Sequence, residues 1–225
     1  MPSPQPIEIF SARVCPYAHR TRLLLIEKDV PFELFEINLK DKPPRFLEVS
    51  PYGKVPAIVH NGVTIYESAI INEYLDETFP HPTFMPADPA GRAKARIWID
   101  YCDDYFIDDH YALLKNTEPG QHASLLQTAQ RNLRFIEVQG LGKLGGDGPY
   151  WFGAEASLVD FAWYPFFERL PAWTHYRGLT IPDDCPRLKA WVDVMSKRAS
   201  VRQIANEPDY YVGRYLGYAK SVLTA

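Results

Sequence analysis

The first 40 residues alternate short apolar runs with an amphipathic stretch. Residues 7–11 and 32–38 have the composition and alternation of β-strands, whereas residues 16–28 place apolar side chains at helical spacing. Pro16 suits the first turn of that helix, because the N–H that proline lacks would have no partner there in any case. The pattern predicts a β-α-β unit at the start of the chain.

A hairpin and another helix follow. Residues 55–59 and 63–66 are β-type runs separated by an Asn-Gly pair, which is a strong signal for a tight hairpin turn. A helical pattern then extends to about residue 79, with Ser68 expected as its N-cap. This order of elements predicts a small α/β domain with a mixed sheet.

The character of the chain changes after a proline-rich segment. Residues 80–89 contain four prolines and mark the expected linker. Helical patterns dominate the sequence beyond it, without a strand-rich region. The expected organisation is therefore an α/β domain over residues 1–79, the linker over residues 80–89, and an all-α domain over residues 90–225.

Two local patterns give more detail within the expected helical domain. Trp98, Tyr101 and Tyr105 share one face at helical spacing, which predicts that they lie in the core. Ser157 and Asp160 have the spacing of a capping box, with Asp in the position that Glu usually takes. We interpret this box as a structural helix start.

Composition places the chain among ordinary globular proteins and excludes several classes. Hydrophobic residues make up 46% and charged residues 23%, which is enough apolar sequence to bury a core. The formal net charge is -4 and no basic stripe is present, so we expect no nucleic-acid partner. No apolar run approaches the roughly 18 residues of a membrane-spanning helix, so we expect no membrane partner.

Cysteine and histidine usage indicates neither disulfides nor a metal. Cys15, Cys102 and Cys185 are too few and too widely spaced for a disulfide framework. The histidines are scattered, and the acidic cluster within residues 100–109 lacks the glycine-containing loop of a calcium site. A solvated face, or pairing with arginine across an interface, is the better interpretation. We therefore expect no bound metal. Because a signal-peptide pattern is also absent, we expect a cytoplasmic protein.

Cys15 stands where the first helix is expected to begin, and this position gives the thiol its candidate chemistry. The free N–H groups and the dipole of a helix N-terminus favour the thiolate and lower the thiol pKa, and Arg13, His19 and Arg20 add positive charge nearby. Position 18 is alanine, so an internal Cys-x-x-Cys disulfide is excluded and a mixed disulfide with a small thiol is the alternative. An inert buried cysteine is the competing interpretation.

Two further features of this domain are candidates for binding a peptide. A cis Val55-Pro56 bond would expose the Val55 N–H and C=O to an extended peptide, whereas an ordinary edge-strand proline is the alternative. At the following helix start, Glu67 is suited to an ammonium group and Ser68 to a carboxylate. Simple helix capping would explain the same pair.

Taken in order, these motifs resemble the cysteine-type glutathione transferases, and the omega and lambda classes most closely. The resemblance extends from residue 7 to about residue 223, and it rests on RVCPYAHRTR at residues 13–22, Asn38-x-x-x-Lys42, SPYGKVP at residues 50–56 and Glu67-Ser68. It implies a thioredoxin-like glutathione-binding domain followed by an all-helical domain. That second domain would carry the pocket for an electrophile.

The resemblance also implies roles for individual residues. Cys15 would form a mixed disulfide with glutathione, which serves as co-substrate. The groove for the tripeptide would be lined by Lys42 for the glycyl carboxylate, Val55 and Pro56 for the cysteinyl backbone, and Glu67 and Ser68 for the γ-glutamyl end. Glutathione carries two carboxylates and one ammonium group, so this distribution of charge is chemically sensible.

The second substrate and the assembly state follow from the same resemblance. The substrate would be a small-molecule electrophile or a disulfide, and the family implies a homodimer. The electrophile pocket would draw on residues from both expected domains, namely Arg13, Val14, Tyr17, Arg169 and Tyr210.

We favour glutathione-dependent thiol transfer or reduction, as in a thioltransferase, a dehydroascorbate reductase or a deglutathionylating enzyme. Trp163, Trp173 and Tyr176 permit a different enzyme, a glutathione-dependent lyase or dehalogenase that acts on an aromatic substrate. A non-catalytic binding module on the same fold is a further alternative, and the glutathione-binding set beside Cys15 argues against it.

Overall fold

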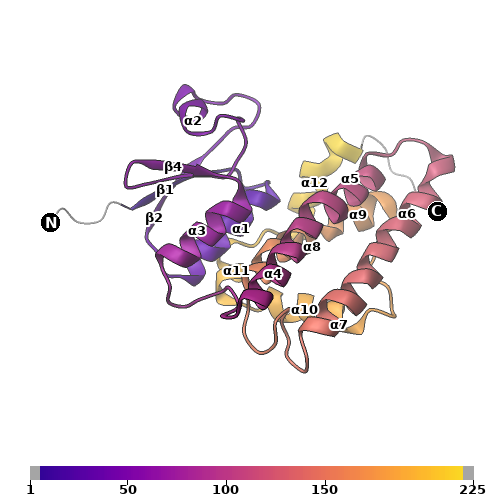
Figure 1. Ribbon diagram of the computed structural model, residues 1–225. Coiled ribbons are helices and arrows are strands. Elements are labelled where there is room, and N and C mark those ends of the chain that lie inside the picture. The colour runs from indigo at the N-terminus through magenta and orange to yellow at the C-terminus, as the bar shows by residue number, and fades with distance from the viewer. Residues whose placement is uncertain (1–5, 220–225) are drawn as a thin grey trace. The chain divides into compact units, whose positions relative to one another are not determined.

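The computed structural model describes residues 6–219; residues 1–5 and 220–225 lie outside the described part. The chain divides after Met85 into two compact units. The first unit contains a four-stranded mixed sheet with helices, and the described part of the second is mostly helical (Figure 1). This architecture confirms the predicted order of an α/β fold followed by an α-helical one.

The sheet of the first unit has the strand order β2-β1-β3-β4. Strand β1 runs parallel to β2 and antiparallel to β3, and β3 runs antiparallel to β4. Helices α1 and α3 lie side by side (Figure 1). In chain order the elements are β1 (Ile7–Ser11), α1 (Pro16–Glu27), β2 (Phe32–Glu36), α2 (Pro44–Val49), β3 (Ala57–His60), β4 (Val63–Tyr66) and α3 (Ser68–Thr78).

The hairpin between β3 and β4 forms where the sequence predicts it. Asn61 and Gly62 have φ values of 51° and 78°, as the two central residues of a type I′ turn require. The turn sets the register, so that His60 pairs with Val63 and Val59 with Thr64. This hairpin supplies the strand that follows Val55 and Pro56.

Helix α1 is buried on nearly every side. All residues from Ala18 to Leu25 are buried, charged ones included, and Ala18 packs in one core cluster with Phe10, Phe46 and Val55. Such a helix has little freedom to shift, because movement would open voids in a close-packed interior. The residue at its N-terminus is therefore held firmly in place.

A buried ion pair ties the segment after α3 to the first unit. The Lys28 Nζ lies 2.8 Å from the Asp76 Oδ1, and it also donates to the carbonyl oxygens of Phe79 and Pro82 at 2.6 and 2.7 Å. Asp76 in turn accepts the backbone N–H of Phe84 at 2.8 Å. Because the charges are paired and hydrogen-bonded, their burial is tolerated and fixes the path of the chain.

The second unit begins with α4, and π-helical turns interrupt two of its longer helices. None of the described helices is long and apolar enough to cross a bilayer. The elements are α4 (Pro89–Tyr101), η1 (Cys102–Phe106), α5 (Ile107–Lys115), α6 (Pro119–Phe135), η2 (Ile136–Leu141), α7 (Gly142–Leu144), α8 (Leu158–Glu168), α9 (Leu170–Arg177), α10 (Pro186–Ser196), α11 (Ala199–Ile204) and α12 (Pro208–Ala219).

The π-helical turn η1 corrects one prediction about the core. Trp98 is buried as expected, but Tyr105 is 59% exposed and the next residue, Phe106, is only 3% exposed. A π-turn takes more residues per turn than an α-helix, so the inward-facing position moves along the chain by one residue. The prediction that Tyr105 lies in the core is wrong for this reason.

The capping box at the start of α8 is confirmed. The Asp160 Oδ2 accepts both the Ser157 N–H and the Ser157 hydroxyl at 2.7 Å, while its Oδ1 accepts the Trp191 indole N–H at 2.8 Å. Burial raises the pKa of Asp160, and these hydrogen bonds oppose that shift. The box therefore anchors a helix start inside the second unit.

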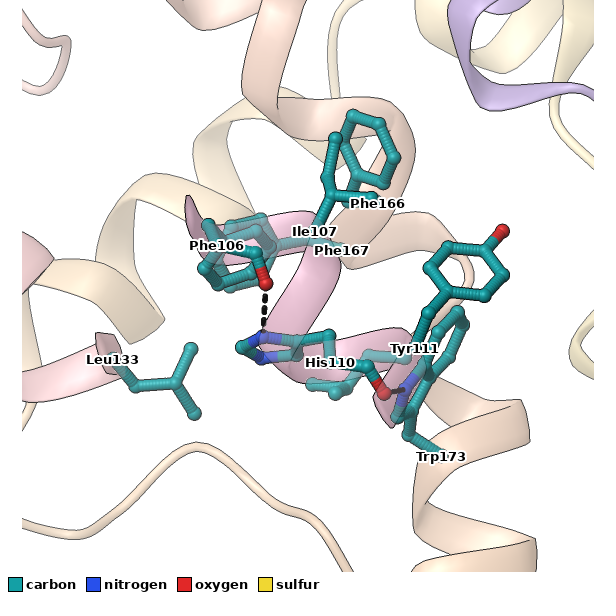
Figure 2. Close-up of a pocket in the computed structure, with 9 residues that line it drawn as sticks. Phe106, Ile107, His110, Tyr111, Leu133, Phe166, Phe167 and Trp173 are labelled. Carbon is teal, nitrogen blue, oxygen red and sulfur yellow. Dashed lines mark hydrogen bonds between the residues drawn. The ribbon is translucent and has the colours of Figure 1, made fainter. Parts of the chain in front are cut away.

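A small apolar cavity lies inside the second unit beside His110 (Figure 2). The volume of this cavity is about 10 Å³. The His110 Nδ1 donates to the Phe106 carbonyl oxygen at 2.7 Å, and the Nε2 has no hydrogen-bond partner within residues 6–219. Burial among apolar side chains lowers the pKa of His110 to about 4, although Asp109 opposes the shift.

We predict that His110 makes the stability of the protein depend on pH. The folded-state pKa is lowered from 6.5 to about 4, so its stabilising effect is complete above pH 6.5 and declines as the pH falls toward 4. The free energy of unfolding should drop by about 2 kcal/mol between pH 7 and pH 5 from this group alone. His110→Leu should remove that part of the decrease, as measured by urea denaturation at both pH values.

His175→Leu is the matched control, because His175 is exposed on α9. It should keep the wild-type dependence on pH. An unchanged dependence in His110→Leu would contradict the prediction.

Candidate active site

Cys15 occupies the N-cap position of α1, with Pro16 as the first helical residue. Its backbone N–H donates to the Ala12 carbonyl oxygen at 2.9 Å, which closes the turn between β1 and α1. The side chain is half-buried and packs against the core cluster that contains Phe10 and Val55. The thiol thus lies at the positive end of the α1 dipole, where a negative charge on sulfur is favoured.

The backbone of Val55 lies directly beside this sulfur. The Cys15 Sγ is 3.6 Å from the Val55 carbonyl oxygen, and the Val55-Pro56 peptide bond is cis. No hydrogen bond to the Val55 N–H occurs within the described part of the chain. A backbone N–H and C=O are thus placed next to the thiol, as the docking of an extended peptide requires.

The loop before Val55 is fixed by Ser50. The Ser50 hydroxyl donates to the Lys54 carbonyl oxygen at 2.7 Å and accepts the Lys54 N–H at 3.0 Å. Gly53 has a φ of 59°, and a Cβ at this glycine would lie 3.4 Å from the Lys42 Nζ. The exposed Lys42 ammonium group therefore lies beside the loop that leads to Val55.

The start of α3 differs from the expected cap. Glu67 is the N-cap residue and has a φ of 69°, a left-handed conformation that is costly for a non-glycine residue. Ser68 is the first helical residue, and its buried hydroxyl accepts a hydrogen bond from the Arg20 Nη1 at 3.3 Å. The prediction that Ser68 is the N-cap is therefore wrong, because Glu67 occupies that position and Ser68 already lies within the helix.

The residues expected for an electrophile pocket are divided between the two units. In the first unit, the backbone N–H of Arg13 donates to the Glu36 Oε1 at 2.7 Å, and the centre of the Tyr17 ring lies 5.0 Å from the Arg20 guanidinium. Val14 is half-buried beside Cys15 in the chain.

In the second unit, Arg169 is fully buried and donates to the Pro165 carbonyl oxygen at 2.6 Å. Its guanidinium also lies 4.6 Å from the Tyr211 ring centre. Tyr210 is half-buried on α12, with the Arg214 guanidinium 5.6 Å from its ring centre. Each residue is thus placed within its own unit.

Two polar contacts escape analysis of the sequence. The Arg20–Ser68 hydrogen bond joins residues 48 positions apart, and nothing in the local pattern of either residue indicates it. The hydroxyls of Tyr111 and Tyr215 lie 3.2 Å apart although 104 positions separate them. Burial strongly raises the pKa of Tyr111, so this hydroxyl remains protonated at neutral pH.

No described residues form a metal-binding group. Within residues 6–219 there is no cluster of three or more His, Cys, Asp or Glu side chains placed to hold a metal ion. The groups that surround the Cys15 sulfur are the backbone of Val55 and the N-terminus of α1.

Comparison with known proteins identifies the class to which this fold and site belong. Residues 14–78 match the glutathione S-transferase N-terminal domain and residues 119–193 match the glutathione S-transferase C-terminal domain. Glutathione S-transferase omega-2 from Rattus norvegicus is 33% identical, over 94% of this chain and 85% of the relative.

Solved structures agree with these matches. A Tau class glutathione S-transferase from mango, Mangifera indica, superposes with a TM-score of 0.90 and 26% identity, over 95% of this chain and 99% of that one. A rice glutathione S-transferase solved in complex with glutathione has a TM-score of 0.86 and 27% identity, over 96% and 98% of the two chains. The chain belongs to the glutathione S-transferase family, which confirms the family predicted from its motifs.

We predict that Cys15 is the most reactive of the three thiols. It is half-buried at a helix N-terminus, whereas Cys102 and Cys185 are buried, and burial together with nearby acidic groups raises the pKa of Cys185. Iodoacetamide at pH 6.5 should therefore label Cys15 first, with the sites assigned by peptide mapping. Labelling of Cys102 or Cys185 at the same rate in the folded protein would contradict this.

Proposed function

We propose that the protein is a cysteine-type glutathione transferase that carries out thiol transfer or reduction through a mixed disulfide between Cys15 and glutathione. The observation that carries the proposal is the Cys15 thiol at the N-cap of α1, 3.6 Å from the Val55 carbonyl oxygen, in a member of the glutathione S-transferase family. Ala18 provides no second thiol, so the disulfide must form with a partner molecule.

Glutathione would bind along the edge formed by Val55 and Pro56. The extended cysteinyl backbone would use the N–H and C=O of Val55, and the Lys42 ammonium group would attract the glycyl carboxylate. The γ-glutamyl end would lie at the start of α3 beside Glu67 and Ser68. The rice relative that was solved with glutathione supports a tripeptide site in this fold.

The chemistry is a pair of thiol–disulfide exchanges. The Cys15 thiolate attacks the glutathionyl sulfur of a mixed disulfide, a new S–S bond forms, and the departing thiolate takes up a proton from water. A second glutathione thiolate then attacks the Cys15–glutathione disulfide and releases glutathione disulfide and the Cys15 thiolate. The net reaction moves the glutathionyl group from the substrate to a second glutathione, which yields the substrate thiol and glutathione disulfide. No metal is required.

The electrophile pocket and the identity of the second substrate remain part of the proposal. Arg13, Val14 and Tyr17 flank the thiol in the chain and are our candidates to contact a disulfide, dehydroascorbate or another small electrophile. Trp163, Trp173 and Tyr176 are buried in the second unit. Core packing accounts for these rings, so they give no particular support to a lyase or dehalogenase that acts on an aromatic substrate.

The assembly state and location stay predictions. We propose a homodimer in the cytoplasm. Exposed apolar side chains on the α4–α6 side of the second unit, including Ile97 and Phe135, support burial of that surface by a partner.

We predict that Ser68→Ala weakens glutathione binding. Removal of the hydroxyl leaves a charged ligand group without a hydrogen bond, so the affinity for S-methylglutathione should fall by about 1–3 kcal/mol in titration calorimetry. Thr21→Val is the matched control. It removes a different α1–α3 hydrogen bond, from the Thr21 Oγ1 to the Asn72 Oδ1 at 3.0 Å, at a position outside the proposed groove.

The control should bind S-methylglutathione as the wild type does, even if it is less stable. Equal affinity of Ser68→Ala and wild type would remove Ser68 from the site.

We predict that Cys15→Ala abolishes thiol transfer, because no other thiol is placed to form the mixed disulfide. Activity with glutathione and hydroxyethyl disulfide should fall to the uncatalysed rate, whereas Cys185→Ala should retain it. Bound glutathione still has its own thiolate, so weak conjugation of chlorodinitrobenzene is compatible with the same variant. Full thiol transfer by Cys15→Ala would exclude the mechanism.

A further inference from the structure

Two backbone dipoles act on the Cys15 sulfur in opposite directions. The N-terminus of α1 presents its positive end, which favours the thiolate. The Val55 carbonyl presents its negative end at 3.6 Å, where it accepts the S–H and opposes ionisation. The ratio of thiolate to thiol at Cys15 therefore depends on both dipoles, and a change at the Val55 carbonyl would shift that ratio.

A peptide ligand in the proposed groove changes this carbonyl. An amide N–H of the ligand that donates to the Val55 oxygen brings the positive end of its dipole to that oxygen. It therefore competes with the Cys15 S–H for the same acceptor. We propose that glutathione and the Cys15 thiol compete for the Val55 carbonyl, so that filling of the groove promotes ionisation of the nucleophile. This inference rests on the proposed function, because it assigns Val55 to the peptide site.

The coupling makes the amount of Cys15 thiolate depend on whether the groove is occupied. Without a ligand, the carbonyl keeps a larger share of the sulfur in the thiol form, and oxidation is slower than in the ligand-bound protein because the thiolate is the reactive form. With a ligand in the groove, the thiolate fraction of Cys15 increases at the site that the glutathionyl sulfur enters. By linkage, the tripeptide must also bind more tightly to the thiolate form than to the thiol form by the same factor.

Other charged groups on the elements around Cys15 set the starting point of this equilibrium. They are Arg13 before α1, His19, Arg20 and Arg22 on α1, Glu36 on β2, Lys42 and Lys54 in the loops, and Glu67 before α3. All of them are present with and without a ligand. A comparison of the two states therefore isolates what the ligand adds.

The experiment uses γ-glutamyl-alanyl-glycine, the tripeptide without sulfur, which fills the groove and cannot react. The Cys15 thiolate is followed by its absorbance at 240 nm from pH 5 to pH 9, with the Cys15→Ser protein as the blank at each pH. With saturating tripeptide, the titration midpoint should move to lower pH, with about a threefold or greater rise in the thiolate-to-thiol ratio.

The direction of the shift separates this coupling from simpler effects. The tripeptide carries net negative charge and excludes water, and either effect alone would raise the midpoint. A midpoint that rises or stays unchanged while calorimetry shows binding would overturn the coupling and leave the proposed function intact. Failure of the tripeptide to bind at millimolar concentration would overturn both.

Discussion

The burial of α1 on nearly every side is the constraint on which the site depends. A helix packed among Phe10, Phe46, Val55 and α3 cannot slide without opening voids, so its first turn is fixed relative to the sheet. Cys15 gains both its place and its electrostatic environment from that fixed turn. The same packing brings Val55 against the sulfur, since Cys15 borders the cluster to which Val55 belongs.

Buried charge serves this arrangement at two points. Arg20 lies fully inside the first unit, and its hydrogen bond to Ser68 connects the start of α3 to α1. Lys28 and Asp76 form an ion pair at the opposite end of the two helices and fix the chain that leaves α3. Because each of these buried charges is paired or hydrogen-bonded, its burial is tolerated.

Local chemistry made part of this molecule predictable from the sequence. The Asn61-Gly62 turn and the Ser157–Asp160 box form because neighbouring residues alone satisfy their geometry. The order of the strands and helices followed from hydrophobic periodicity. In the candidate site, the helix start at Cys15 was predictable for the same local reason.

Features that depend on distant partners were not predictable. Ser68 looks like a helix cap until Arg20, 48 positions earlier, is placed beside its hydroxyl. Tyr105 belongs to a regular stripe until the π-helical turn exposes it, and Tyr111 meets Tyr215 only in the folded unit. For Ser68 and Tyr111 the deciding interaction is tertiary, and for Tyr105 it is a change in helix type; none of them leaves a mark on the local pattern.

The central claim is that Cys15 forms a mixed disulfide with glutathione as part of the reaction. The most direct measurement is mass spectrometry of the folded protein after brief exposure to glutathione disulfide at pH 7, with peptide mapping under non-reducing conditions. We expect one glutathionyl group, carried by Cys15, that reduced glutathione then removes. Absence of an adduct at Cys15, or an adduct at Cys102 or Cys185 instead, would contradict it.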